Sequence, residues 1–276
     1  MDLTLISTFG SAEPWQLSHK RAKALSQTLR ERSILEHLNT AGAARIADLA
    51  ERLGVSEETV RRALKRLEAV GRVTRVHGGV HLRDWSTEPS FALRIGLHAD
   101  RKRAIAARVA GLIETGASLF LDVGSTTAFV AQALRMHREL LVVTNSLAVA
   151  HVLAGRGGNR VFMAGGELRP HDGGAFGAEA LAFVRQFRVR HAVLSATALD
   201  AKSGFMLQDL REAEFSRAII ECAETAIIAA DSSKFDRTAP IRITAPEAVH
   251  RLVTDAAPTG ALAEMLAVAG VEVTLA

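Results

Sequence analysis

Residues 45–82 read RIADLAERLGVSEETVRRALKRLEAVGRVTRVHGGVHL, and this segment predicts the structure of the N-terminal part of the chain. Apolar residues recur at helical spacing within 46–53 and again within 60–67. Between the two runs, Gly54 can take the left-handed conformation of a tight corner. Ser56 follows, and its side-chain oxygen can cap the second helix. The stretch therefore predicts two short amphipathic helices joined by a sharp turn.

The second of these helices carries its basic residues off the apolar stripe, which is the layout of a recognition helix in a DNA major groove. A solvated helix face has a similar composition, but here the helix-turn-helix spacing, the Ser56 cap and a basic hairpin occur together. The hairpin is the β-like stretch 72–82, with Gly78 and Gly79 as its turn, and it predicts a wing. We therefore expect contacts to double-stranded DNA from a set of polar, basic and turn residues. They are Ser56, Thr59, Arg61, Arg62, Lys65, Arg66, Arg75, His77 and Gly78.

Composition limits the class of protein. The chain has 276 residues, 48% of them hydrophobic, so it can bury a sizeable core and predicts two domains. Residues 1–83 carry 14 Lys and Arg against 9 Asp and Glu, whereas residues 84–276 carry 20 against 21. The basic excess thus lies in the part with the helix-turn-helix pattern, as expected for a protein that binds a polyanion.

Several other classes are disfavoured. The one cysteine, Cys222, cannot form an intrachain disulfide, and the Cys and His spacing resembles no zinc site. We interpret Cys222 as a small packed hydrophobic residue. The N-terminus lacks the pattern of a signal peptide, and no stretch approaches the roughly 20 apolar residues of a membrane span. We expect a cytoplasmic protein that uses no metal and no cofactor.

The chain divides into parts that differ in pattern. They are an N-terminal extension of unknown role at 1–28, a winged helix-turn-helix domain at 29–83, a linker at 84–97 and an α/β domain at 98–276. Glu88 and Pro89 mark the linker, because the residue before a proline is disfavoured in a helix. The periodicity places the first helix of the DNA-binding domain at 30–39 and an Arg- and Ala-rich helix at 98–114.

Beyond residue 116, short apolar runs alternate with helical ones. Near-continuous apolar strands joined by helices predict a mostly parallel sheet that is covered on both faces. In such sheets, ligands bind at the carboxyl ends of the strands. The expected strands are 118–123, 140–144, 160–164, 192–196, 226–230, 251–254 and 271–275. The expected helices are 127–136, 147–154, 179–186, 212–223 and 260–269.

Polar residues follow several of these strands. The loop from Asp122 to Thr127 offers a glycine, hydroxyl groups and a helix N-terminus, which are the parts of an anion cradle, although Ser and Thr also begin ordinary helices. Lys234 and Arg169 can each neutralise a phosphate, and carboxylate or amide groups can bind sugar hydroxyls. Together these groups predict a site for a small phosphorylated polyol or sugar. Its expected residues are Asp122, Gly124, Ser125, Thr126, Thr127, Asn145, Gly165, Gly166, Arg169, Asp200, Glu212 and Lys234.

The chain from about residue 30 to its end resembles the DeoR family of bacterial transcriptional regulators. VSEETVRRALKRLEAVGRVTRVHGG resembles the winged helix-turn-helix signature of the family, and LDVGSTT, VVTNSL, AGGELR and DSSKF resemble its sensor-domain motifs. The long match AGGELRPHDGGAFGAEALAFVRQFR, at 164–188, is the most specific. With RAIIE, DSSKFDRTA and TDAAP, it makes the likeness greatest to family members that regulate glycerol catabolism.

The resemblance implies a repressor that acts as a homodimer or homotetramer. Its sensor domain is expected to be similar in fold to ribose-5-phosphate isomerase, to bind a phosphorylated intermediate and then to release operator DNA. Glycerol 3-phosphate is the expected effector, and another sugar phosphate is the alternative. A phosphosugar isomerase is a further alternative, but Asp200 and Glu212 do not form a convincing acid and base pair for proton transfer.

Overall fold

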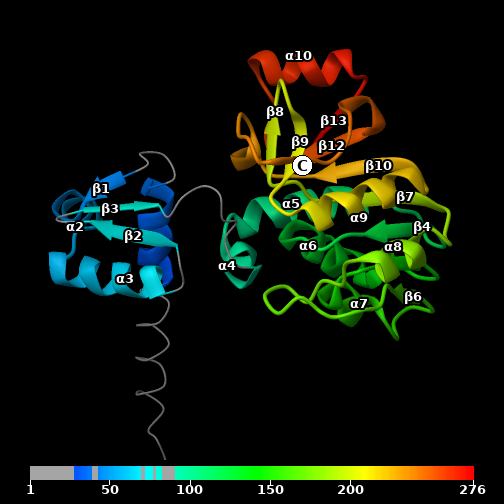
Figure 1. Cartoon of the computed structure of the whole chain (residues 1–276), viewed down its shortest axis with the longest axis horizontal. Coiled ribbons are helices and arrows are strands. Elements are labelled where there is room, and N and C mark those ends of the chain that lie inside the picture. Colours follow the sequence, from blue (N-terminus) through cyan, green and yellow to red (C-terminus); the bar gives the residue numbers. More distant parts are fainter. Residues whose placement is uncertain (1–27, 39–42, 70–71, 77–78, 83–90) are drawn as a thin grey trace, which may run out of the picture. The chain divides into compact units, whose positions relative to one another are not determined.

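The computed structural model describes residues 28–38, 43–69, 72–76, 79–82 and 91–276 (Figure 1). The chain forms two compact units, which meet in the sequence between Trp85 and Ser86. The predicted extension, apart from residue 28, and residues 84–90 of the predicted linker lie outside the described ranges, as do His77 and Gly78 of the predicted wing turn.

The first unit contains the predicted helix-turn-helix. A helix at residues 28–38 precedes α2 (Ile46–Leu53) and α3 (Glu57–Ala69). Gly54 ends α2 with a φ of 61°, and its backbone N–H donates to carbonyl groups of the last turn of that helix. The left-handed corner predicted at Gly54 is therefore confirmed. The core of the unit consists of apolar side chains that recur at helical spacing. It includes Ile34, Leu35, Leu38, Leu49, Val60, Ala63, Leu64 and Leu67.

A small antiparallel sheet completes the first unit. Its strands are β1 (Ala43–Arg45), β2 (Val73–Val76) and β3 (Gly79–Leu82), in the order β1-β3-β2. The predicted wing hairpin is confirmed, since β2 and β3 pair with each other. The sequence analysis does not predict β1, because three residues are too short to show an alternating pattern.

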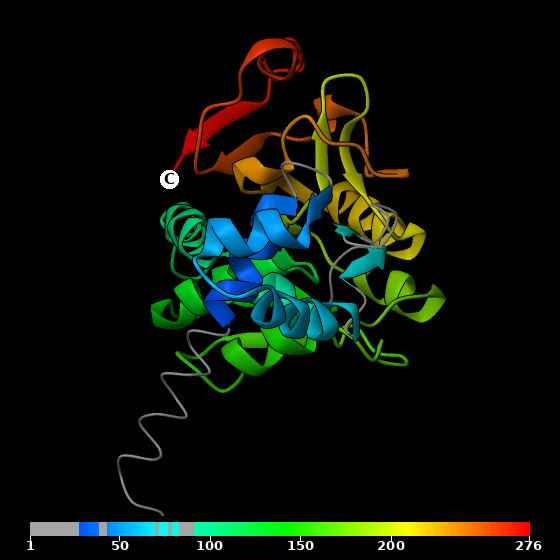
Figure 2. The same cartoon turned by 90° about the vertical axis from the view of Figure 1, so that its left-hand side faces the viewer.

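The second unit is built on a seven-stranded parallel sheet with the order β13-β12-β10-β7-β4-β5-β6 (Figure 1). The strands are β4 (Ser118–Leu121), β5 (Leu141–Thr144), β6 (Arg160–Met163), β7 (Val189–Leu194), β10 (Ala223–Ala229), β12 (Arg251–Thr254) and β13 (Glu272–Leu275). All the predicted strands are present, with shifted ends in most cases. β7 starts at Val189 because this residue pairs with Ala223 of β10. In the turned view of Figure 2, β13 (red) lies at an edge of the unit.

Helices cover both faces of this sheet, as predicted. The helices are α5 (Ala99–Ala110), α6 (Ser125–Ala133), α7 (Leu147–Leu153), α8 (Ala178–Val184), α9 (Leu210–Glu221) and α10 (Gly260–Val268). Leu119 and Leu121 of β4 share a buried cluster with α5, α6 and α7, whereas Phe120 belongs to a cluster with α8, α9 and α10. This alternation follows from the period of a β-strand.

Two parts of the second unit differ from the sequence analysis. Residues 91–97 are assigned there to a linker, but Phe91–Gly96 forms helix α4, which contacts α6 and belongs to the second unit. The sequence after Pro89 does not predict this helix, because six residues are too few to show a helical repeat of apolar side chains. A second, antiparallel sheet, β11-β9-β8, is also absent from the predictions. Its strands are β8 (Ala198–Asp200), β9 (Gly204–Leu207) and β11 (Ile241–Arg242).

Candidate functional site

A pocket lies in the second unit at the carboxyl ends of β4 and β7, where a parallel sheet is expected to bind its ligand. It is partly open to solvent. The loops after the strands line it together with α4, α9 and the 3₁₀ turn Ser232–Lys234. The lining residues are Arg94, Val123, Ser125, Thr126, Ser195, Ala196, Thr197, Leu207, Glu212 and Lys234.

The loop between β4 and α6 is shaped by close packing against Ser195. A Cβ atom on Gly124 would lie 2.1 Å from Ser195 Oγ, so only glycine fits there without a shift. Thr127 is buried, and its hydroxyl donates to the carbonyl groups of Asp122 and Gly124, each at 3.1 Å. Gly124 supplies no side-chain cap to α6. The first amides of α6 therefore keep donor capacity at the end of the helix that contributes Ser125 and Thr126 to the pocket lining.

Asp122 is buried directly behind this loop. Its Oδ2 accepts from the backbone N–H of Ser195 at 2.8 Å and from the hydroxyl of Ser195 at 3.2 Å. Its Oδ1 has no hydrogen-bond partner among the described residues. Burial raises the pKa of Asp122 to about 6, although the bonds from Ser195 act in the opposite direction.

Cationic groups gather around the N-terminus of α6. Arg94 and Lys234 line the pocket, and Lys102 of α5 lies below Ser125, with its Nζ 2.9 Å from Ser125 Oγ. Burial alone would raise the pKa of Asp231, but Lys234, a hydrogen bond from a backbone amide, and Lys102 outweigh this effect and lower the pKa. The sequence analysis misses Lys102 and Arg94. A signal for Lys102 is present, because it falls on the same helical stripe as the buried residues of α5.

The pocket lining also includes an acidic residue, Glu212. Its carboxylate contacts the guanidinium group of Arg169, which also pairs with Asp172 and lies 3.5 Å from Asp209. The Arg169 side chain is only 9% exposed and lies over the ring of Phe176, 4.4 Å from its centroid. Sequence analysis assigns Arg169 to phosphate binding, but it does not line the pocket, and its charge is used to hold these carboxylates together.

Other predicted residues also have structural contacts outside the pocket lining. The Asn145 amide donates to the carbonyl of Ala175 and so anchors the loop between β6 and α8, to which Gly165 and Gly166 belong. Asp200 Oδ2 accepts from the amides of residues 202 and 203 and closes the turn between β8 and β9. The structure therefore brings together Ser125, Thr126, Glu212 and Lys234, with Asp122, Gly124 and Thr127 directly behind them.

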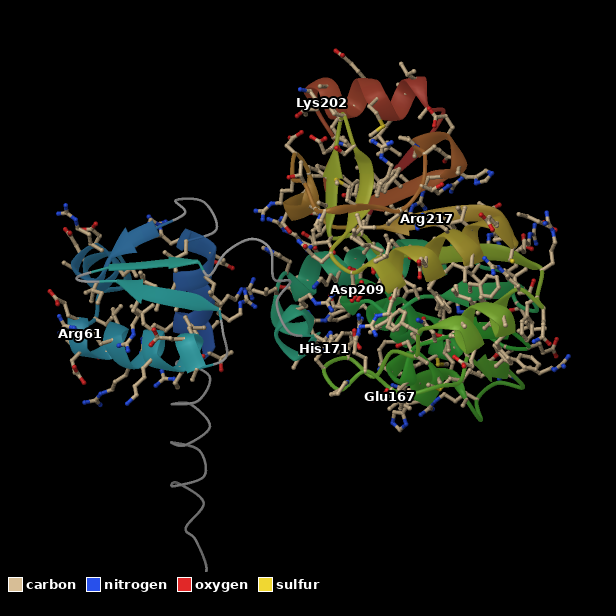
Figure 3. The ribbon with its side chains drawn as sticks, in the orientation of Figure 1. Arg61, Glu167, His171, Lys202, Asp209 and Arg217 are labelled. Atoms are coloured by element: carbon tan, nitrogen blue, oxygen red, sulfur yellow. The ribbon has the colours of Figure 1, made fainter. Side chains whose placement is uncertain are left out.

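The predicted DNA-binding residues of the first unit lie on and beside α3. The Ser56 hydroxyl accepts from the Thr59 amide at 3.3 Å, so the predicted cap is confirmed. The predicted arginines are all exposed or half-exposed and form ion pairs with neighbouring glutamates. These pairs are Arg61 with Glu57 at 2.5 Å, Arg62 with Glu58 at 3.0 Å, Arg66 with Glu31 at 2.6 Å and Arg75 with Glu68 at 2.7 Å. Figure 3 shows Arg61 on α3, and Lys65 on the same helix is exposed.

A winged helix-turn-helix unit joined in one chain to an α/β unit with a small-molecule pocket defines the class of ligand-responsive transcriptional regulators. The chain belongs to the DeoR family: residues 30–85 match the DeoR-like helix-turn-helix domain and residues 97–256 match the DeoR C-terminal sensor domain. The DeoR-like helix-turn-helix domain and the repressor names of the relatives identify the chain as a transcriptional repressor. This assignment excludes the alternative of a phosphosugar isomerase.

Relatives along nearly the whole chain carry names of the same kind. The glycerol-3-phosphate regulon repressor of Escherichia coli is 35% identical over 88% of this chain and 96% of that protein. The transcriptional repressor CsqR of the same organism is 35% identical over 83% of this chain and 88% of that protein. Ribose 5-phosphate isomerase A from Methanocaldococcus jannaschii is a structural neighbour with 13% identity and a TM-score of 0.37, over 50% of this chain and 54% of that chain, too low a score to support an assignment.

Among the helices of the described ranges, none combines the length and the apolar character that crossing a membrane requires.

Proposed function

We propose that this chain represses an operon for glycerol or carbohydrate catabolism in the cytoplasm, and that a phosphorylated intermediate releases it from operator DNA. Glycerol 3-phosphate is the first candidate for this effector. The name of the glycerol-3-phosphate regulon repressor, 35% identical to this chain, supports that choice. CsqR is equally identical to this chain, and its name does not specify glycerol 3-phosphate, so another sugar phosphate is the second candidate.

The mixed charge of the pocket lining is the observation that carries this proposal. Arg94, Lys234 and the first residues of α6 line the pocket, and Lys102 contacts Ser125. Charged donors and a helix N-terminus bind a phosphate strongly. Glu212 also lines the pocket and can accept from hydroxyl groups. A small molecule that carries both a phosphate and hydroxyl groups matches this lining.

On the DNA, we assign the N-terminal half of α3 to the major groove. Thr59, Arg61 and Arg62 would contact base edges or adjacent phosphates, while Lys65, Arg66 and Arg75 would contact the backbone. A homodimer or homotetramer should prefer paired half-sites about 34–36 Å apart, or a multiple of that distance. Sedimentation of the free protein as a monomer at the working concentration would contradict this part.

Fluorescence anisotropy tests the proposal. A labelled duplex from the region upstream of the gene is bound to the protein at fixed salt, because phosphate contacts make the affinity depend on ionic strength. Glycerol 3-phosphate is then titrated, with glycerol and inorganic phosphate as controls. Release by glycerol 3-phosphate alone supports both the repressor and its effector. Binding that no sugar phosphate reverses contradicts the proposed effector class, and binding no tighter than to a scrambled duplex contradicts the DNA assignment.

A further inference from the structure

Lys102 is a buried cation in a helix whose other buried residues are apolar. It lies in α5, is 3% exposed, and shares its stripe with Ile105, Ala106 and Val109. Burying an ammonium group is unfavourable unless its N–H groups are hydrogen-bonded. The acceptors around Nζ therefore determine what this residue holds in place.

The ammonium group of Lys102 joins two elements of the pocket. Nζ donates to the backbone carbonyl of Arg94 at 2.5 Å and to Ser125 Oγ at 2.9 Å. The Arg94 carbonyl belongs to the last turn of α4, where carbonyl groups have no donor within the helix. Lys102 thus supplies a donor and a positive charge to the C-terminal end of α4. Ser125 is the first residue of α6 and lines the pocket.

Helix α4 is the first described element of the second unit after the segment that leads from the first unit. It is separated from α5 by a bend in which His98 has a φ of 52°, a left-handed conformation that is uncommon outside glycine. The bend prevents α4 from continuing into α5, so the end of α4 depends on contacts from other side chains. The hydrogen bond from Lys102 Nζ to the Arg94 carbonyl is a contact of this kind.

We propose that Lys102 transmits effector binding from the pocket to α4, an inference that rests on the proposed anionic effector. A phosphate at the first turn of α6 is a stronger acceptor for an ammonium group than a neutral carbonyl is. The long, flexible stem of lysine lets Nζ follow that phosphate. Loss of the bond between Lys102 and the Arg94 carbonyl removes a restraint from the end of α4, so the effector favours the state in which α4 lacks this restraint.

The inference separates Lys102 from a residue that only binds the effector. Loss of a pure binding residue would leave a repressor that holds DNA and no longer responds. Loss of Lys102 removes the contact with Arg94 even without effector, so it should imitate the effector-bound state. Lys102→Met keeps most of the stem and removes the charge, and Arg108→Met removes an exposed charge from the last turn of the same helix as a matched control.

Amide hydrogen exchange over residues 91–97 is the first readout, measured on the full chain by mass spectrometry. We expect exchange in the wild type to rise about tenfold when glycerol 3-phosphate binds, a change typical of local opening. Lys102→Met should show the raised rate without any ligand, and Arg108→Met should behave as the wild type. Unchanged exchange in Lys102→Met overturns the inference. If that variant does not fold, unchanged exchange in the liganded wild type overturns it equally.

Operator affinity is the second readout, measured by anisotropy with and without glycerol 3-phosphate. Lys102→Met should bind the duplex about as weakly as the effector-saturated wild type, and further effector should change its affinity less than about twofold. A variant that binds DNA as tightly as the free wild type contradicts the inference. Calorimetry of glycerol 3-phosphate with the wild type tests the proposed effector separately. If no heat of binding appears, that effector is wrong, while exchange in unliganded Lys102→Met still decides the role of Lys102.

Discussion

The cationic side chains of α3 and those around the sensor pocket differ in their exposure to solvent. On α3 the arginines lie at the surface and pair with glutamates of nearby turns, and the Arg62 side chain is 72% exposed. Around the sensor pocket the cations are buried or half-buried, and Lys102 is 3% exposed. The first region suits a large polyanion that many weak contacts hold, whereas the second suits one small anion.

Solvent explains why this difference matters. Exposed ion pairs are weak, because water and salt screen them. Charges in a buried site interact more strongly, because the surrounding medium is less polarisable. Substitutions in the pocket should therefore have larger effects that depend little on salt, and substitutions on α3 should have smaller effects that salt reduces.

The largest effect is expected at Gly124, where the pocket is most closely packed. Gly124→Ala places a Cβ atom 2.1 Å from Ser195 Oγ, so it should lower the free energy of unfolding by about 3 kcal/mol and abolish effector binding. Gly165→Ala is the matched control, because a Cβ atom there has no neighbour within 4 Å. Urea unfolding measures the free energy of unfolding of both variants. Equal values would refute the role of the contact between Gly124 and Ser195.

A buried charge at Asp122 should make stability depend on pH. The pKa of Asp122 is raised from 3.8 to about 6, so the ionised form is disfavoured in the folded state. Relative to Asp122→Asn, the wild type should lose up to about 3 kcal/mol of stability as the pH rises from 4 to above 6. Unfolding of both proteins over this range measures the difference, and a constant difference would contradict the raised pKa.

Lys234 tests the proposed phosphate contact in the pocket. Lys234→Met should weaken binding of glycerol 3-phosphate by about 2 kcal/mol, or roughly 30-fold, because a charged donor is lost from a half-buried site. Operator binding without effector should not change. Lys202→Met is the control, since Lys202 is exposed at the turn between β8 and β9 (Figure 3). Equal calorimetric affinities for the two variants would place the phosphate elsewhere.

Arg62 tests the DNA side of the comparison. Arg62→Ala should weaken operator binding by about 1–2 kcal/mol, with a smaller loss at high salt. Arg32→Ala removes an arginine from a similar pair, 2.9 Å from Glu36, in the helix 28–38, which we do not assign to DNA. Anisotropy at two salt concentrations measures both. If Arg32→Ala loses as much affinity as Arg62→Ala, the major-groove assignment of α3 is wrong.

The smallest effect is expected from the glutamates that pair with these arginines. Glu58→Gln removes a negative charge next to Arg62 and should tighten binding to a scrambled duplex about threefold, since the arginine then interacts more freely with phosphates. Glu36→Gln serves as the control. No change in the affinity of Glu58→Gln for the scrambled duplex would mean that the pairs do not modulate the DNA surface.

Strong local signals explain what the sequence could predict. Gly54 takes the left-handed conformation that ends α2, and Ser56 caps α3. Both roles are typical of these residue types, so the turn between the two helices could be predicted. The parallel strands are apolar throughout, so they stand out from the helices between them. The short strand β8 and the helix α4 give no such signal, because three or six residues do not complete a recognisable period.

Residues of the pocket lining could be predicted only where they lie in a segment that follows the carboxyl end of a strand. Ser125 and Lys234 lie in the segments that follow β4 and β10, and the structure places both in the lining. Arg169 lies in the segment after β6 and Asp200 ends β8, but an ion pair and turn hydrogen bonds hold them in other contacts. Lys102 precedes the sheet altogether. Its contact with Ser125 depends on how α5 packs against α6, which sequence spacing does not specify.

The glutamate partners on α3 have a consequence at the scale of the chromosome. A repressor meets far more arbitrary DNA than operator DNA, and its share on arbitrary sites is set by its general affinity for phosphates. On the proposed assignment of α3 to the major groove, paired arginines would lower that affinity, while a guanine edge could still draw Arg62 from Glu58. Fewer copies are then held on the bulk of the chromosome, so a smaller number of molecules per cell keeps an operator occupied.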